Sequence, residues 1–341
     1  MSVTAAFREG LRRVNGAPAL LAGTFALTLM VSLPLAYALH GMIAEHLGAS
    51  LAADAAASGT NPAWWREFLA QATGLGTTFI PSIVGFGAVL NNLSDFMDRT
   101  RPAATIIGVT AAWLVVWSFL TGGIIDRLAR ARRTRSQGFF SACGLHFWRL
   151  LRLGIIALIA YGILFTYLHA WIFDDVYGAL TRNVTVERTA FGIRLAGYAI
   201  FGALLCLCNI IFDYARIRLI VEDRRSAIGA LLAGGRFVLR HAMQVLGLYA
   251  LNALAFLVLV TLYALVVPGA PRSGFAMGAV LALGELYILG RHYLKLLFYA
   301  SQTVFFQGAL AHAAYTAAPV PVWPDSPAAE MIANADPTGE L

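Results

Sequence analysis

The stretch LAGYAIFGALLCLCNIIFDYARIRLIVEDRR (195–225) decides the class of fold. Its first part, 195–212, is 18 residues long and carries no charge. A helix needs about 20 apolar residues, at about 1.5 Å each, to cross the hydrocarbon core of a bilayer. From Asp213 onward, charged and hydrophobic residues alternate densely. The stretch therefore predicts a membrane-spanning helix over 195–212 that leaves the membrane at Asp213.

The composition of the whole chain is typical of a membrane protein. Of its 341 residues, 59% are hydrophobic and 13% are charged, whereas about a quarter of the residues in a soluble domain are charged. The formal net charge is +7, and every basic residue except Lys295 is an arginine. Because these arginines stand beside apolar runs, we expect membrane lipids with anionic headgroups as their partners, and no nucleic acid. The arginine bias indicates a GC-rich bacterial genome.

Cysteine and histidine residues give no sign of a disulfide framework or a metal site. The three cysteines, Cys143, Cys206 and Cys208, form neither an even set nor a CxxC spacing. We expect them to be small buried hydrophobic residues. The seven histidines include no pair at i and i+4 and no cluster with cysteine. We therefore expect no metal and no cofactor.

Six apolar runs are candidates for membrane-spanning helices. Only helices satisfy the backbone hydrogen bonds of such runs in lipid, so the sequence predicts an all-α polytopic helix bundle with interfacial amphipathic helices. The sixth run is interrupted by Glu285, Arg291, His292 and Lys295. The predicted spans cover about 17–39, 103–125, 153–173, 195–212, 242–267 and 274–297.

The distribution of arginine predicts how the chain is oriented. With a cytoplasmic N-terminus, 18 basic residues lie in inner segments and seven in outer segments, as the positive-inside rule requires. We expect a basic cytoplasmic N-terminus over 1–16, a membrane domain over 17–317 and a disordered cytoplasmic tail over 318–341. The first apolar run is too long for the core of a cleaved signal peptide. We place the protein in the bacterial inner membrane, with both termini in the cytoplasm.

The outer segment, 41–102, is predicted to lie in the membrane interface or to re-enter the membrane. Its run 77–93 is short and contains Pro81. A full crossing there would put the basic N-terminus and the basic loop after residue 126 on opposite sides. Trp64 and Trp65 indicate helical pieces near the headgroups, where tryptophan is favoured.

Three related sequences precede the helices that run outward. Gly10, Gly144 and Gly234 are each followed two positions later by an arginine or a histidine, and an apolar run begins soon afterwards. Serines precede the second and third of these glycines by eight residues. The pattern predicts three tandem helical hairpins that form a pseudo-repeat.

The charged segment after Asp213 is interpreted as an amphipathic elbow on the cytoplasmic interface, with a ligand or partner site as the alternative. Asp213 and Arg216 are three residues apart, a spacing at which opposite charges pair on a helix. Arg218 and Glu222 are four residues apart and are expected to pair in the same way.

The same segment predicts a second short helix and a set of lipid contacts. Ser226 is expected to cap the helix AIGALLA, which would end at Gly234 and Gly235. Arginine side chains on the elbows are expected to reach headgroup phosphates. The residues expected to make these contacts are Arg127, Arg130, Arg132, Arg133, Arg216, Arg218, Arg224 and Arg225.

In its six-span layout, its FDYARIRLIVEDR segment and its three glycine motifs, the chain resembles the multi-pass membrane domain attached to some bacterial glycerophosphodiester phosphodiesterases. It is similar also to stand-alone six-span bacterial inner-membrane proteins of that type. The resemblance covers about residues 5–315. The sequence contains no phosphodiesterase domain and no histidine and carboxylate metal cluster of that kind. The resemblance therefore implies a membrane module without phosphodiester chemistry.

The sixth predicted span carries the strongest candidate for a functional site. Glu285, His292, Lys295 and Gln302 follow one another at spacings of 7, 3 and 7, which places them on one stripe of a helix. A charge near the bilayer centre costs at least about 2.5 kcal/mol, so such residues face protein or water. Glu285 either lines a proton or solute path or makes one buried pair that fixes helix packing.

The leading functional prediction is a non-enzymatic inner-membrane protein of structural or accessory type. It would contact anionic lipid through its arginines and associate with itself or with an envelope complex. The alternative is a small transporter or channel-like protein with a polar path around Glu285. A lipid-modifying membrane enzyme comes third, because the sequence shows no cluster of histidines or carboxylates at one interface; it also contains no P-loop, GxSxG, HExxH or DxD motif. Convergence of Asp54, Asp95, Asp98 or His46 over an outer cleft would favour that third reading.

Overall fold

The computed structural model describes residues 1–48, 50, 52–57, 61–79, 104–131, 134–266 and 274–310. All regular secondary structure in these residues is helical. Five helical stretches are long and apolar enough to cross a membrane, as the all-α membrane class requires. The elements are α1 (Val3–Asn15), α2 (Pro18–Leu47), α3 (Ala53–Ala57), α4 (Pro62–Gln71), η1 (Gly74–Thr78), α6 (Ala104–Arg130), α7 (Ser136–Ile163), η2 (Leu164–Leu168), η3 (Trp171–Val176), α8 (Tyr177–Thr181), α9 (Glu187–Val221), α10 (Ala227–Arg240), α11 (Ala242–Val266) and α12 (Phe275–Ala309).

Five apolar helical stretches overlap the first five predicted spans, and all of them except α11 extend beyond these spans. α7 continues through the π-helical turns η2 and η3 into α8 without a break, a stretch of 46 residues. At about 1.5 Å per residue, this stretch is roughly twice as long as a bilayer's hydrocarbon core is thick. Apart from Gly274, which caps the helix, the predicted span 274–297 lies within α12, which is not among the five apolar stretches. Six spans therefore stay a prediction.

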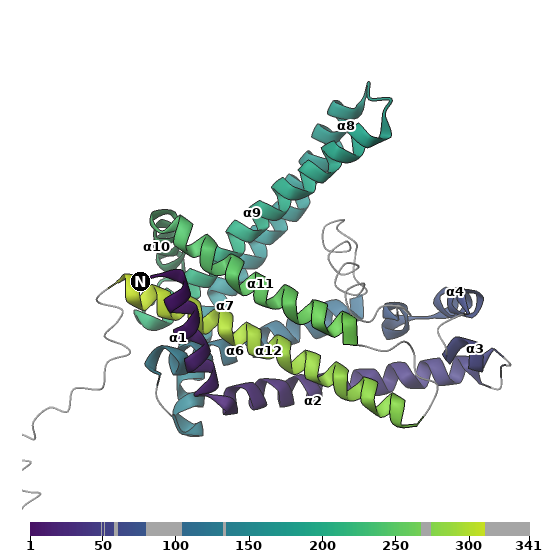
Figure 1. Ribbon diagram of the computed structural model, residues 1–341, viewed down its shortest axis with the longest axis horizontal. Helices are drawn as coiled ribbons and strands as arrows, with labels where there is room; N and C mark the ends of the chain where they lie inside the picture. Colours follow the sequence, from purple (N-terminus) through teal and green to yellow (C-terminus); the bar gives the residue numbers. More distant parts are fainter. Residues whose placement is uncertain are drawn as a thin grey trace, which may run out of the picture.

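The main hydrophobic core lies at one end of the molecule, which we call the core end. α1, α10, the beginning of α7 and the ends of α6, α9 and α12 meet there (Figure 1). Tyr214, Phe305 and Phe306 are among its largest buried side chains. From the core end, the α7–α9 hairpin and the pair α11–α12 diverge (Figure 1). Away from this end the helices expose apolar side chains such as Met30, Tyr37 and Leu265, which is the pattern that lipid-facing helices show.

Three helix pairs form the most extensive interfaces among the described residues: α6 with α7, α9 with α10, and α1 with α12. The last pair joins the two ends of the described chain. A Cβ atom added at Gly10 would lie 2.9 Å from the backbone nitrogen of Ser301, and one at Gly234 would lie 3.0 Å from that of Ala215. Glycine is therefore required for these two backbones to approach so closely.

The glycines act differently from their predicted roles. Gly234 does not end a short helix, because α10 continues to Arg240; the glycine allows α10 to pack against α9 and does not terminate it. Gly144, which the sequence motif aligns with Gly10 and Gly234, has nothing within 4 Å of an added Cβ. In the α6–α7 pair the close approach comes instead from Gly123, whose added Cβ would lie 2.5 Å from the Cys143 Sγ atom.

The charged segment after Asp213 does not form an elbow there. α9 runs without a break from Glu187 to Val221, and Tyr214, Ile217 and Leu219 are buried. α6, α7, α10 and α12 all pack against α9, so the apolar positions that predicted a membrane interface face other helices instead. The chain turns only after Val221. The bend therefore lies between Val221 and Ser226 and not at Asp213, and the place where the chain leaves the membrane stays a prediction.

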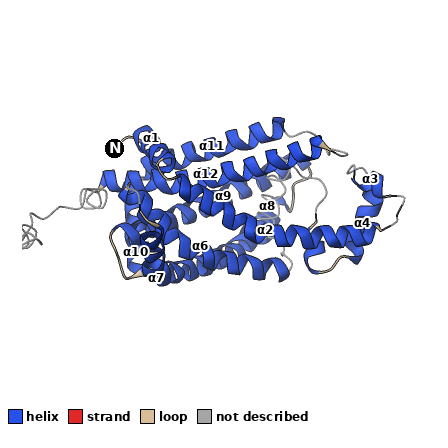
Figure 2. Ribbon diagram, turned by 90° about the horizontal axis from the view of Figure 1, so that it is seen from below, coloured by secondary structure: helices blue, strands red, loops and turns tan. Residues whose placement is uncertain are grey.

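The outer segment contains the expected helical pieces: α3 and α4 lie near the far end of α2 (Figure 2), and η1 packs against α2. Trp64 is buried against Phe68 and His46. Residues 80–103 lie outside the described residues, and with them most of the run 77–93 predicted to re-enter the membrane. The tail 318–341 and the arginines Arg132 and Arg133 also lie outside.

Candidate binding site

A group of polar side chains lies between the helices close to the core end. We call it the central polar cluster. It draws residues from five helices: α6, α7, α9, α11 and α12. Its members are Trp117, Tyr161, Asn209, Asp213, Arg216, Tyr249, Lys295, Tyr299 and Gln302.

Asp213 is the acidic residue of the cluster and is buried. Its Oδ1 atom accepts a hydrogen bond of 3.0 Å from Arg216 Nη1 one helical turn later. Its Oδ2 atom lies 3.4 Å from Asn209 Nδ2, and Gln302 approaches it from α12. A buried carboxylate is stable only when it is paired and hydrogen-bonded. Arg216 provides the pairing charge, and Asn209 and Gln302 provide the further polar contacts.

Asn209 connects three helices through its side-chain amide. Its Nδ2 donates to the Tyr249 hydroxyl on α11 at 2.9 Å, and its Oδ1 accepts from the Tyr161 hydroxyl on α7 at 3.4 Å. Because hydrogen bonds of this kind hold helices together inside a membrane, Asn209 fixes α11 against the α7–α9 hairpin.

Lys295 brings a second positive charge to the cluster. Its ammonium nitrogen lies 3.4 Å from the centroid of the Trp117 ring, a favourable cation–π contact. Trp117 Nε1 in turn donates to the Tyr299 hydroxyl at 3.2 Å. Lys295 lies within electrostatic range of both Asp213 and Arg216, but it forms no ion pair with any described residue.

The charges of the cluster do not balance. One carboxylate, Asp213, faces two cations, Arg216 and Lys295. Arg291, one turn from Lys295, adds further positive potential. Because charge is poorly screened away from water, the region favours an added anion.

A cleft of about 470 Å³ opens beside the cluster, between the α7–α9 hairpin and α11. Most of its wall is apolar, and its polar groups are those of Tyr161, Asn209 and Tyr249. This volume falls in the usual range for small-molecule sites. The lining residues are Leu158, Tyr161, Phe165, Leu205, Cys206, Asn209 and Tyr249.

The predicted stripe on α12 divides between different surroundings. Lys295 and Gln302 belong to the central polar cluster, whereas the His292 Nε2 atom lies 3.0 Å from the Thr28 hydroxyl on α2. The Glu285 Oε2 atom is buried and has no hydrogen-bond partner among the described residues. Glu285 does not line the cleft, and both hypotheses about its role stay predictions.

Several of the arginines expected at lipid headgroups are engaged with the protein instead. Arg127 is buried and donates to the Gly16 carbonyl at 3.1 Å. Arg218 pairs with Glu222 at 2.8 Å and donates to the Ala233 carbonyl at 3.0 Å.

Other members of that set are more accessible. Arg130 pairs with Asp126 at 2.8 Å and is partly exposed. Arg224, which contacts Glu222, and Arg225 are exposed. Ser226 caps α10 as expected, accepting a hydrogen bond of 3.1 Å from the Gly229 nitrogen.

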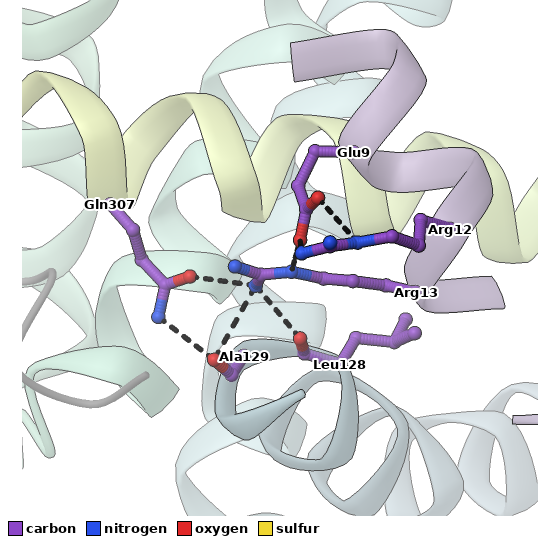
Figure 3. Close-up of polar contacts among 6 residues, drawn as sticks. All are labelled: Glu9, Arg12, Arg13, Leu128, Ala129 and Gln307. Atoms are coloured by element: carbon purple, nitrogen blue, oxygen red, sulfur yellow. Dashed lines mark hydrogen bonds and ion pairs between the residues drawn. The ribbon is translucent and has the colours of Figure 1, made fainter. Parts of the chain in front are cut away.

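The N-terminal helix is attached to the core end by a second polar group, which the sequence did not predict (Figure 3). Arg13 Nη1 donates to the Leu128 carbonyl at 2.9 Å and to Gln307 Oε1 at 2.8 Å. Gln307 Nε2 donates to the Ala129 carbonyl at 3.1 Å. Leu128 and Ala129 belong to the last turn of α6, whose carbonyls have no partner within the helix. Arg13 therefore joins α1, α6 and α12.

Glu9 holds the Arg13 side chain in this position. Its Oε1 atom accepts from Arg13 Nε at 3.2 Å, and its Oε2 atom pairs with Arg12 at 2.8 Å. Burial alone would raise the pKa of Glu9, but the hydrogen bonds from Arg12 and Arg13 outweigh it and leave this pKa below its ordinary value. Glu9 therefore stays charged at neutral pH and supports the docking of α1.

The described residues contain no group of three or more histidine, cysteine or acidic side chains that could hold a metal. His46 Nδ1 accepts from Trp64 Nε1 at 3.1 Å, and Asp54 is exposed. Asp95 and Asp98 lie outside the described residues, so the outer cleft that would favour an enzyme is not tested.

No family model, curated protein or solved structure matches this chain. The site is therefore interpreted from its own chemistry: a mostly apolar cleft that ends at hydroxyl and amide groups, next to a surplus of positive charge.

Proposed function

We propose that this protein is a six-helix integral membrane protein of accessory type, without enzymatic activity, that binds anionic lipid at its core end. The core end would face the cytoplasm of a bacterial cell, as the arginine distribution predicts, and the partners would be membrane lipids together with a second copy or an envelope complex. The likeness to the membrane domain of glycerophosphodiester phosphodiesterases belongs to this proposal, as do three tandem hairpins.

The main support for this proposal is the exposed surface of α10. Its buried face, which includes Ala230, Gly234 and Phe237, packs toward α9. On another face, Ile228, Leu232 and Leu239 are 63%, 60% and 74% exposed. They stand at spacings of four and seven residues, so they form one apolar stripe on the helix. An exposed apolar stripe on a helix of this kind is typical of burial at the headgroup level of a bilayer.

Exposed arginines flank this stripe. On α10, Arg236 lies between Leu232 and Leu239, and Arg240 follows Leu239; Arg224 and Arg225 precede the helix. The beginning of α7 has a similar composition, with Phe140, Leu145 and Trp148 exposed between Arg135 and Arg152. Apolar side chains in the acyl region and guanidinium groups at the phosphates would hold the core end at an anionic membrane surface.

Substitution of two arginines at each end of the molecule tests this proposal. The double variant Arg236→Gln and Arg240→Gln should bind fewer phosphatidylglycerol molecules in mixed micelles with phosphatidylcholine, measured by native mass spectrometry. Each arginine near an anionic surface contributes about 1 kcal/mol, or roughly fivefold in affinity. The control is Arg182→Gln with Arg188→Gln, two exposed arginines at the far end of the α7–α9 hairpin. Equal losses in both double variants would refute the proposal.

One observation favours the second candidate, a transporter. Glu285 is a carboxylate within a mainly apolar stretch of α12, and its Oε2 atom is buried without a partner among the described residues. An ionisable group placed in this way inside a membrane is commonly part of a proton or ion path. A pH-dependent flux in proteoliposomes would support this candidate over the accessory role.

A further inference from the structure

From the cleft and the central polar cluster together we infer that the protein holds one anionic phospholipid, with an acyl chain in the cleft and its phosphate beside Lys295 and Arg216. The inference rests on the proposed membrane location but concerns a different site from the surface arginines of α10. It assigns to this site a single bound lipid, which is distinct from the many exchanging lipids of a membrane surface.

The cleft has the chemical character that a lipid chain needs. Leu158, Phe165 and Leu205 supply apolar wall, and Leu158 is 61% exposed at the protein surface. The cleft therefore opens outward on a helix that is itself a candidate membrane span. A chain that enters from the bilayer would replace lipid contacts with contacts to these side chains.

The polar groups lie at one end of the cleft. Along α9, Leu205 precedes Asn209 by one helical turn, and Asp213 and Arg216 follow it toward the core end. Tyr161 and Tyr249 meet Asn209 from the two neighbouring helices. A lipid whose chain lies along Leu205 and Phe165 would thus have its ester and headgroup region at hydroxyl and amide groups that form hydrogen bonds.

The charge surplus specifies the headgroup. Arg216 pairs with Asp213 at 3.0 Å, whereas Lys295 contacts the Trp117 ring at 3.4 Å and feels Asp213 only at longer range, without a direct ion pair to a described residue. A phosphate accepts charge-assisted hydrogen bonds from ammonium and guanidinium groups, and its negative charge would balance the cluster. A zwitterionic headgroup also carries a phosphate, but it brings a cation that would restore the surplus.

The test removes the charge and the space separately. Lys295→Met keeps a long apolar side chain against Trp117 and removes the cation. Arg188→Met is its control, because Arg188 is exposed at the beginning of α9 and does not belong to the cluster. Leu158→Trp fills the cleft from its exposed side; Leu262→Trp is its control, because Leu262 is exposed on α11 and does not line the cleft.

Native mass spectrometry of delipidated protein measures the outcome, with phosphatidylglycerol, phosphatidylcholine and glycerol 3-phosphate added in turn. We expect one saturable phosphatidylglycerol per chain, bound about tenfold more tightly than phosphatidylcholine, whose choline cation would restore the surplus positive charge; a tenfold ratio corresponds to about 1.4 kcal/mol. Lys295→Met should abolish the preference, and Leu158→Trp should weaken both phospholipids, while both controls bind like the unmodified protein.

Three results would overturn the inference. They are an unchanged preference in Lys295→Met, unchanged binding in Leu158→Trp, or glycerol 3-phosphate binding as tightly as the phospholipid, which would leave no role for the cleft. Loss of binding in Arg236→Gln with Arg240→Gln, but not in Lys295→Met, would support the surface proposal and refute this one.

Discussion

Gly10→Ala should destabilise the protein by breaking the contact between the first and last described helices. The added Cβ atom would lie 2.9 Å from the N, Cα and Cβ atoms of Ser301. Two of these three atoms are backbone of α12, so a side-chain rotation cannot relieve the clash. Either α1 or α12 must move, and both are tied to α6 through Arg13 and Gln307.

The magnitude follows from comparison with Gly144→Ala. Alanine is favoured over glycine in a helix by about 1 kcal/mol, and both positions are helical. Gly144 has nothing within 4 Å of an added Cβ, so its variant should gain that amount. Overpacking costs about 1–3 kcal/mol, so the free energy of unfolding of Gly10→Ala should be lower than that of Gly144→Ala by about 1–3 kcal/mol.

Unfolding of the two variants in mixed micelles, followed by circular dichroism against the mole fraction of a denaturing detergent, provides the free energies. Since the helix propensity term is common to both, the difference isolates the contact between α1 and α12. Equal stabilities, or a more stable Gly10→Ala, would show that α1 does not pack on Ser301 as described.

The remaining predictions concern the attachment of α1 and the role of Glu285. Arg13→Met leaves the Leu128 carbonyl and Gln307 without their charged donor and should lower the free energy of unfolding by about 2–3 kcal/mol. Arg12→Met should lower it by less than about 1 kcal/mol, because the Arg12 side chain is 80% exposed and that of Arg13 is 10% exposed. Equal losses in the two unfolding curves would contradict this prediction. The pKa of Glu9 is lowered in the folded protein, so its contribution is fully present above the ordinary value and disappears as the pH falls through the lowered pKa; stability measured against pH should lose this component in Glu9→Gln. If Glu285 lines a path, Glu285→Gln should leave the folded protein intact and abolish pH-dependent flux in proteoliposomes. If the unmodified protein shows no flux and Glu285→Gln reduces the amount of folded protein, the packing role is favoured.

The membrane-spanning helices could be predicted from sequence because their signal is local. Long uncharged runs such as 195–212 permit one structure in lipid, and the ends of the runs need no tertiary information. The core end could not be predicted in this way. Residues from Ser301 to Gln307 are polar in part yet buried, because α1, from the opposite end of the chain, covers them together with α6, α10 and α11.

The charged segment of α9 shows the same limit. Its alternation of arginine with isoleucine, valine and leucine is compatible with a membrane surface or with a buried helix that has internal ion pairs. Only the packing of α6, α7, α10 and α12 around it decides between the two. Asp213 and Arg216 do pair as their spacing predicts, which shows that local spacing predicts the pair but not its surroundings.

Part of the candidate site was visible in the sequence. Lys295 and Gln302 stand out as polar residues on one stripe of a mainly apolar helix, and both lie in the central polar cluster. Asn209 gave a weaker signal, a single amide within an apolar run, and its partners Tyr161 and Tyr249 gave none. Their meeting depends on the relative placement of α7, α9 and α11, which hydropathy does not encode.

The most direct measurement is an electron cryomicroscopy structure of the protein in a bilayer that contains phosphatidylglycerol. We expect density for one acyl chain between Leu158 and Tyr249, ending in a phosphate within hydrogen-bond distance of Lys295. A cleft closed by side chains, or a protein carboxylate paired with Lys295 in place of the phosphate, would contradict the proposed lipid site.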